Sequence, residues 1–143
     1  MASSGKIVHI ELPAGDADRA QRFYAELFGW QFADSGMPGI DYWLTEGTEP
    51  PGAIMKVDDG QTGHPIIYFG VEDIEAASRQ VRELGGTADE KGPVPGQGWF
   101  AGCKDTEGNA FSLWQGDPSV TVEQAAQYAE AHQKMGAEQE ARA

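Results

Sequence analysis

The chain has 143 residues, of which 10 are Lys or Arg and 23 are Asp or Glu, so its formal net charge is −13. This negative charge repels phosphate backbones and anionic membrane surfaces, so nucleic acid and membranes are not expected partners. No run approaches the roughly 20 apolar residues that cross a bilayer, and the first residues include no apolar signal region. We therefore expect a cytoplasmic protein, in which the single Cys103 is a buried thiol without a disulfide partner.

The first half of the chain predicts a strand, a helix and three further strands. Residues 6–12 are rich in β-branched and apolar side chains and precede a Pro-Ala-Gly turn, which is typical of a strand. Asp16 can cap the next helix by accepting a hydrogen bond from a free backbone amide, and Gly29 suits the left-handed residue that ends one. The apolar residues at helical spacing between them are Ala20, Phe23, Tyr24, Leu27 and Phe28. Three short runs, 30–33, 41–46 and 53–57, then predict an antiparallel meander.

The second half repeats this order. Residues 65–71 predict a strand, Asp73 a helix cap, and Gly85-Gly86 the end of that helix. Its apolar stripe consists of Ile74, Ala77, Val81 and Leu84. A short strand near Thr87 follows, and then strands at 99–103 and 110–115. The glycine-rich segment 91–98 between them lacks the Lys-Ser/Thr pair of a phosphate loop, so we expect a connecting loop or, alternatively, a mobile flap.

A constant offset of 57 residues relates the two halves. It carries Asp16 onto Asp73, and it also carries Tyr42 onto Trp99, with no gap between the two points. Each half alone would leave one face of its sheet uncovered, so the two halves must pack together. We therefore predict an α+β fold in which two tandem βαβββ modules, at about 6–58 and 64–116, form an open, cupped sheet around a cleft.

The tail at 119–143 differs in composition from the domain predicted at 1–118. It is rich in Ala, Glu and Gln, which favours a C-terminal helix, and Thr121 and Gln124 have the spacing of a capping box. Its apolar stripe is weak. The helix is therefore expected to pack on the body or on a second subunit, or to fray beyond about His132.

Two segments carry a family resemblance: VHIELPAGDADRAQRFYAELFGW at 8–30 and KDTEGNAFSLWQ at 104–115. The pairing of DxxRAxxFYxxLFGW with DxxGN resembles the vicinal oxygen chelate superfamily, which includes glyoxalase I, bleomycin-resistance proteins, fosfomycin-resistance enzymes and extradiol dioxygenases. The resemblance covers about residues 6–115 and implies the duplicated fold. It implies much less about activity, because this scaffold hosts many chemistries.

The resemblance also implies where a metal would be bound. Metal-dependent members place four ligands on the first and last strands of each half, and the matching points here are His9, Met55, Ile66 and Ser112. Only His9 is a good ligand, since Ile66 has no donor atom, Met55 offers a soft thioether and Ser112 a neutral oxygen. We expect no cofactor, with a divalent metal at His9 as the alternative. His64 is the remaining candidate imidazole, and its turn sequence predicts an exposed residue.

Strand alternation places His9 and Glu11 on one face of the first strand, with their Cα atoms roughly 6–7 Å apart. They could contact one ligand together or act as an acid and base, and the alternative is a hydrogen-bonded pair without catalytic function. The residues expected to line the cleft by the same alternation are His9, Glu11, Met55, Ile66, Tyr68, Ser112 and Trp114. This mostly apolar lining with a few polar groups suits a small organic molecule.

Three functions remain open from the sequence. The first is a metal-free member of the superfamily that binds a small organic molecule in its cleft. The second is an enzyme, either a lyase or isomerase of glyoxalase type that uses His9 with Glu11, with or without a divalent metal, or a dioxygenase relative. The third is a protein-interaction module. For each of them a homodimer is expected.

Overall fold

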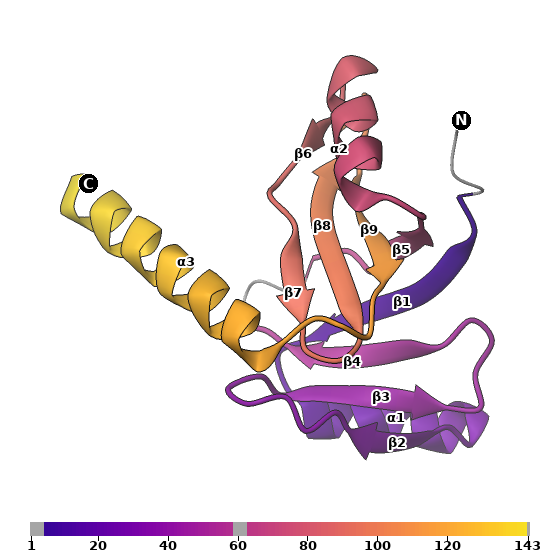
Figure 1. Cartoon of the computed structure of the whole chain (residues 1–143). Helices are drawn as coiled ribbons and strands as arrows, with labels where there is room; N and C mark the ends of the chain where they lie inside the picture. The colour runs from indigo at the N-terminus through magenta and orange to yellow at the C-terminus, as the bar shows by residue number, and fades with distance from the viewer. Residues whose placement is uncertain (1–4, 59–62, 143) are drawn as a thin grey trace. The chain divides into compact units, whose positions relative to one another are not determined.

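The computed structural model describes residues 5–58 and 63–142, and the chain divides into two compact units, Gly5–Phe69 and the residues from Gly70 onward. The elements of the first module are β1 (Ile7–Ala14), α1 (Ala17–Phe28), β2 (Gln31–Asp34), β3 (Tyr42–Glu46) and β4 (Gly52–Lys56). Those of the second are β5 (Ile66–Gly70), α2 (Ile74–Glu83), β6 (Thr87–Ala88), β7 (Gly92–Val94), β8 (Gly98–Lys104) and β9 (Ala110–Gly116), followed by α3 (Val122–Arg142) (Figure 1). The predicted α+β class, the tandem modules and the terminal helix are confirmed.

In the first unit the strands follow the order β2-β3-β4-β1-β5. The predicted meander is present, because β2 pairs with β3 and β3 with β4, both antiparallel. Strand β1 then pairs with β4 in parallel and with β5 in antiparallel orientation. Consequently β1 is a central strand, and side chains that alternate along it have neighbours on both sides.

Helix α1 begins and ends where the sequence predicts. The side chain of Asp16 accepts a hydrogen bond from the backbone N–H of Arg19 at 3.0 Å. Gly29 has φ 72°, and its N–H donates to the carbonyl of Ala25 at 2.8 Å. An L-residue with a side chain would be strained at that φ, which explains the glycine.

The apolar stripe predicted for α1 is only partly buried. Ala17 and Ile54 form the core with Ala14, and Tyr24 of α1 packs against them. The neighbouring row of the helix faces outward: Phe23, Leu27 and Phe28 keep 59%, 57% and 58% of their surface exposed. A helix that packs on a sheet through small alanines buries only a narrow row of side chains. The apolar stripe in the sequence is wider than this row, so it predicted more buried residues than the structure has.

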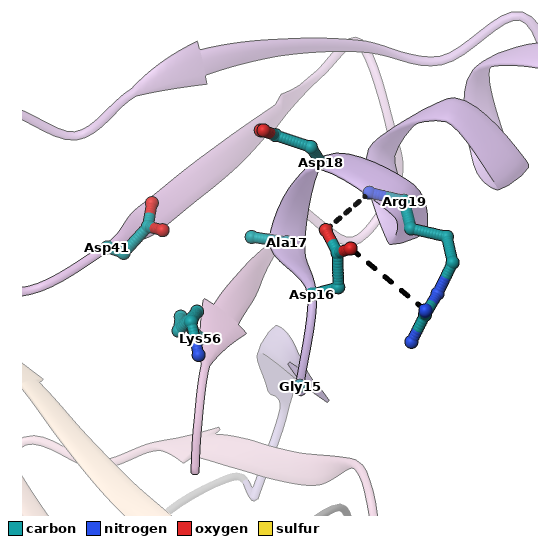
Figure 2. Close-up of a pocket in the computed structure, with 7 residues that line it drawn as sticks. All are labelled: Gly15, Asp16, Ala17, Asp18, Arg19, Asp41 and Lys56. Carbon is teal, nitrogen blue, oxygen red and sulfur yellow. Dashed lines mark hydrogen bonds and ion pairs between the residues drawn. The ribbon is translucent and has the colours of Figure 1, made fainter. Parts of the chain in front are cut away.

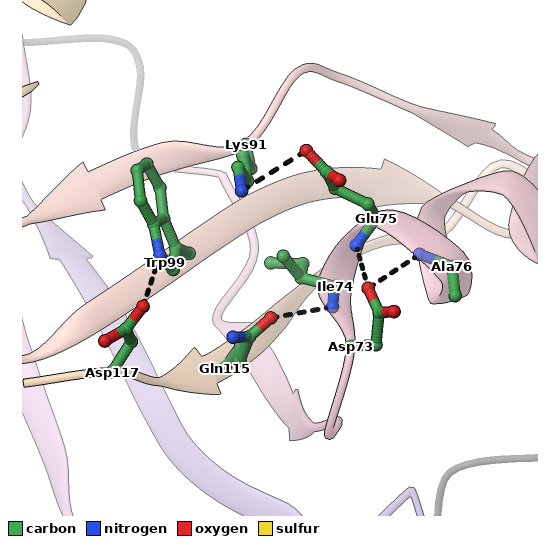
Figure 3. A network of polar contacts seen from close by, with 8 residues as sticks. All are labelled: Asp73, Ile74, Glu75, Ala76, Lys91, Trp99, Gln115 and Asp117. Carbon is green, nitrogen blue, oxygen red and sulfur yellow. Dashed lines mark hydrogen bonds and ion pairs between the residues drawn. The ribbon is translucent and has the colours of Figure 1, made fainter. Parts of the chain in front are cut away.

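The second unit is built on β8, which pairs antiparallel with β9, β6 and β7. Helix α2 starts at the predicted cap, since Asp73 accepts hydrogen bonds from the N–H groups of Glu75 and Ala76 at 3.1 Å each (Figure 3). Ile74 and Ala101 are fully buried, as is most of Cys103, and burial raises the pKa of that thiol to about 11. The prediction of a buried cysteine is confirmed.

The segment at 91–98 is a strand and a turn, where the sequence predicted a loop. Strand β7 occupies part of it and pairs with β8. The turn is closed by Gln97 N–H donating to the carbonyl of Val94 at 3.0 Å, and Gly96 N–H donates to the carbonyl of Val120 at 2.8 Å. Backbone pairing with β8 therefore makes part of this segment a strand, which its glycines and prolines did not indicate.

The gap-free repeat was wrong at one strand. Tyr42 lies opposite Met55, whereas Gly102 lies opposite Ser112. Strands β4 and β9 thus correspond at an offset of 57, but β3 and β8 correspond at 60, so Gly102 and not Trp99 is the counterpart of Tyr42. The cause is a difference in length between the two hairpin connections. The innermost paired residues are nine positions apart in the first module, at 44 and 53, and six positions apart in the second, at 104 and 110.

Helix α3 begins with the predicted capping box. Gln124 N–H donates to the hydroxyl of Thr121 at 3.0 Å, and Thr121 N–H donates to the side chain of Gln124 at 2.8 Å. The ring of Tyr128 lies edge-on to Phe100 at 6.2 Å between centroids. The later turns of α3 extend away from β7 (Figure 1). None of the helices within the described residues combines the length and apolar character that a bilayer crossing needs.

Candidate functional site

One face of the first unit collects the polar residues that the sequence singled out. Across the paired strands His9 lies opposite Tyr68, Glu11 opposite Ile66, and Tyr42 opposite Met55. Leu12 and Ile54 alternate with these residues and pack in the core beside α1. The predicted alternation of β1 is therefore confirmed, and it places His9 and Glu11 on the face away from α1.

His9 is held by two tyrosines. Its Nε2 lies 2.8 Å from the hydroxyl of Tyr42, and the two rings are stacked with an interplanar angle of 13°. The ring of Tyr68 meets the imidazole edge-on, at 5.2 Å between centroids and 87°. Contacts on two sides fix the orientation of the imidazole.

Glu11 is only 7% exposed. The hydroxyl of Tyr68 donates to its Oε2 at 3.0 Å. Glu11 and Tyr68 are 57 residues apart, so they occupy equivalent positions of the two modules.

Burial sets the charge state of this group. It lowers the pKa of His9, because removal from water disfavours the imidazolium. It raises the pKa of Glu11, although the polar contacts of its carboxylate with Tyr42 and Tyr68 offset part of that increase. The pKa of Tyr42 is raised by burial and then by the charge of Glu11. Burial therefore favours a neutral imidazole at His9 and a protonated phenol at Tyr42.

The four points at which the superfamily binds metal do not supply a divalent site. Ile66 has no donor atom, and Met55, which lies opposite Tyr42, offers only a thioether. Ser112 belongs to the second unit, where it lies opposite Gly102. Within the described part of the chain no three residues among His, Cys, Asp and Glu are grouped to hold a metal ion.

The other predicted lining residues lie on β9 of the second unit. Ser112, which is 6% exposed, and Trp114 share a face, because they lie opposite Gly102 and Phe100. Leu113 alternates with them and is buried. A single cleft lined by both sets of residues stays a prediction. His64 is exposed, as its turn sequence predicted.

Sequence reasoning missed Tyr42. A usable signal existed: Tyr42 alternates with Trp43, which packs in the core, and it lies opposite Met55, which was recognised. Trp99, by contrast, is part of a structural network. Its Nε1 donates to Asp117 at 3.1 Å, and Lys91 Nζ lies 4.2 Å from its ring centroid (Figure 3).

Two pockets surround the start of α1, and neither is lined by His9 or Glu11. The first, of about 400 Å³, is lined by Gly15, Asp16, Ala17, Asp18, Arg19, Asp41 and Lys56 (Figure 2). The second, of about 510 Å³, is more apolar and includes Leu12, Phe23 and Tyr24. Asp16 lines both pockets, but its carboxylate caps helix α1 and therefore already has a structural role.

Two βαβββ modules of this kind define a member of the vicinal oxygen chelate superfamily. The structure is similar to that of methylmalonyl-CoA epimerase from Mycobacterium tuberculosis, with a TM-score of 0.63 and 17% identity over 82% of this chain and 94% of that one. At this level of identity the similarity concerns the fold.

The sequence model of the glyoxalase-like domain matches residues 8–114, and the chain belongs to this family. It is 31% identical over 122 residues to a glyoxylase-like domain-containing protein of Didymella fabae, which covers 79% of this chain and 95% of that protein. It is 32% identical over 127 residues to a probable lactoylglutathione lyase of Vibrio parahaemolyticus, with 79% and 92% covered. The resemblance stated from the sequence is confirmed.

Proposed function

We propose that the protein binds a small organic molecule on the face of the first module that carries His9, through hydrogen bonds and apolar contacts and without the metal site of its relatives. The observation that carries the proposal is the buried carboxyl group of Glu11, which is hydrogen-bonded to Tyr68 beside His9 and Tyr42. Burying a carboxyl group costs free energy even when it is hydrogen-bonded. Such a cost is typical of a functional site.

The chemistry around this group supports an organic ligand. Met55 and Ile66 lie on the same face and offer apolar contact, and the ring of Tyr68 offers a surface for stacking. A few polar groups among apolar ones orient a ligand while the apolar groups supply most of the affinity. Relatives are named for lactoylglutathione and methylmalonyl-CoA, so these two thioesters are the first compounds to test.

The experiment is a thermal-shift assay with lactoylglutathione, methylmalonyl-CoA and a panel of small organic molecules, all in the presence of a chelator. A compound that binds the native state raises its stability by mass action, by about 2.7 kcal/mol at a hundred times Kd. We expect at least one compound to raise the melting temperature of the wild type and to lose this effect with Glu11→Ala or Tyr68→Ala.

The exposed Glu46 on β3 supplies the matched control, because E46A removes a carboxylate from the same sheet outside the proposed site. Its shift should equal that of the wild type. A silent panel, together with melting curves for Glu11→Ala and Tyr68→Ala that match the wild type, would contradict the proposal.

The contact between His9 and Tyr42 favours a second candidate function, an isomerase that moves a proton. A neutral imidazole is a suitable base, and a buried acid nearby can return the proton. If so, the protein should exchange the proton next to the thioester carbonyl of methylmalonyl-CoA with solvent. NMR in deuterium oxide measures this exchange, and a rate unaffected by His9→Gln would contradict the assignment of His9 as the base.

A homodimer is part of the proposal, since the superfamily resemblance implies one. Removal of the residues after Val120 should then lower the mass observed by sedimentation by more than the mass of the deleted helix, if α3 joins the subunits. An unchanged stoichiometry would restrict α3 to packing on its own unit, where Tyr128 contacts Phe100.

A further inference from the structure

We infer that the hydroxyl group of Tyr42 stands where a metal ion would bind Nε2 of His9, and that it keeps this imidazole from coordinating a metal. Tyr42 is thus a positioning residue, which acts through His9. The two residues therefore account for the loss of the one good ligand among the four metal points. This role of Tyr42 belongs to the free protein and does not depend on the ligand of the proposed function.

The contact comes from a strand that carries none of the four metal points. Tyr42 lies on β3, and β4 separates that strand from β1, which carries His9. The Tyr42 hydroxyl lies 2.8 Å from Nε2, which is within hydrogen-bond distance. The two rings are also stacked, with an interplanar angle of 13°. Tyr42 therefore contacts the imidazole through its ring as well as its hydroxyl, and a phenylalanine would keep the ring.

The direction of this hydrogen bond makes no difference to a metal ion. If Tyr42 donates, its proton lies on the lone pair of Nε2, and if His9 donates, Nε2 carries a proton of its own. A metal ion needs that lone pair to be free. In both cases it must first break the hydrogen bond, whose net contribution lowers the affinity of Nε2 for metal by up to about tenfold.

The neighbouring carboxylate is bonded in the same way. The hydroxyl of Tyr68 donates to Oε2 of Glu11 at 3.0 Å, and Glu11 is only 7% exposed. The polar groups of the two possible ligands on β1 therefore each have a phenol partner. In the second module the counterpart of Tyr42 is Gly102, opposite Ser112, so no phenol reaches that metal point from the equivalent strand position.

The test is nickel(II) binding to a chain in which His9 is the only histidine. The exposed His64 and His132 are the other two, and both are changed to Gln in every protein measured, including the parent. The full chain, labelled on histidine, is titrated with nickel chloride at pH 7, and paramagnetic broadening of the His9 ring signals gives the affinity. Tyr42→Phe should bind nickel up to about tenfold more tightly than the parent.

Tyr24 supplies the matched control. It packs against the core beside α1, on the other face of the sheet, and Tyr24→Phe removes the same hydroxyl group away from the site. Tyr24→Phe should bind nickel as the parent does. Addition of His9→Ala to Tyr42→Phe should remove the gain, measured by titration calorimetry. A general loosening of the fold would not produce a gain that depends on His9.

Equal affinities of the parent and Tyr42→Phe would overturn the inference. Weaker binding by Tyr42→Phe would also overturn it, because Tyr42 would then be a metal ligand itself. If Tyr42→Phe fails to fold, the parent decides: His9 signals that broaden at one equivalent of nickel would mean that the imidazole is open to metal, and signals that stay sharp support the inference. The thermal-shift panel tests the proposed function separately, since a compound can stabilise the protein with either nickel result.

Discussion

At the scale of single residues, the site consists of pairs of side chains that lie on different strands. The sequence predicted that His9 and Glu11 share a face, because alternation along a strand depends only on parity. It did not predict that Tyr42 and Tyr68 would satisfy their polar groups. Those contacts depend on the register between strands, and the register of β3 depends on a hairpin whose length a single sequence does not reveal.

The buried carboxyl of Glu11 predicts a dependence of stability on pH. Its pKa is raised in the folded protein above the ordinary 4.5. Between that value and the raised one the folded state binds more protons than the unfolded state, so stability falls as pH rises. The melting temperature of the wild type should thus fall relative to that of Glu11→Gln from pH 4.5 upward.

Differential scanning calorimetry of the two proteins from pH 4 to 8 measures this difference. His9 titrates in both proteins, so its opposite contribution cancels in the comparison. A difference between wild type and Glu11→Gln that stays constant with pH would contradict the raised pKa.

At the scale of elements, the hairpin of β8 and β9 contains a close approach that only glycine permits. A Cβ at Gly98 would overlap the carbonyl oxygen of Gln115 and lie 2.8 Å from the ring of Trp114. Gly98→Ala should therefore destabilise the protein by about 1–3 kcal/mol, the usual cost of overpacking. Urea denaturation followed by tryptophan fluorescence gives the free energy of unfolding.

Gly116 is the matched control, since it lies directly opposite Gly98 and a Cβ there would meet nothing within 4 Å. Gly116→Ala should change the free energy of unfolding by less than about 0.5 kcal/mol, as is usual for a surface substitution. Equal effects of the two substitutions would show that the close approach at Gly98 is not what constrains this hairpin.

Helix α3 provides a second prediction at this scale. Tyr128 packs on Phe100 and close to Gly92, whereas Gln127 beside it is exposed. Tyr128→Ala should raise the hydrogen exchange of the amides at 124–132, because tertiary packing contributes most of the stability of such a helix. Gln127→Ala should leave that exchange unchanged. Exchange in Tyr128→Ala equal to that of the wild type would mean that other contacts hold the helix.

The elements themselves were largely predictable. Caps at Asp16 and Asp73 and the capping box at Thr121 are local signals, and each one set a helix boundary correctly. Segment 91–98 was not predictable, because its glycines and prolines indicate a turn while pairing with β8 makes part of it a strand. Nor was the exposure of Phe23, since hydrophobic periodicity identifies a stripe without stating its width.

At the scale of the whole molecule, a net charge of −13 implies self-repulsion in the compact state. Salt screens such repulsion, with a Debye length of about 10 Å at 0.1 M and about 3 Å at 1 M. The melting temperature at pH 7 should therefore rise with sodium chloride. Potassium chloride should act equally, because screening depends on ionic strength. A melting temperature independent of salt would contradict this view of the surface.

Membership of this family raises the question of whether the chain binds a metal. The chain belongs to the glyoxalase-like domain family, yet three of its four metal points carry Met55, Ile66 and Ser112. We propose that the hydrogen-bonded group around His9 recognises the ligand without a resident metal. This claim concerns the whole protein, because the ligands of a metal ion can come from separate parts of the chain.

Elemental analysis of the protein purified without chelator tests this claim most directly, with His9→Ala measured in parallel. We predict that zinc, nickel, manganese, iron and cobalt together amount to well under one ion per chain, and that the two proteins do not differ. About one divalent ion per chain in the wild type, lost in His9→Ala, would contradict the account.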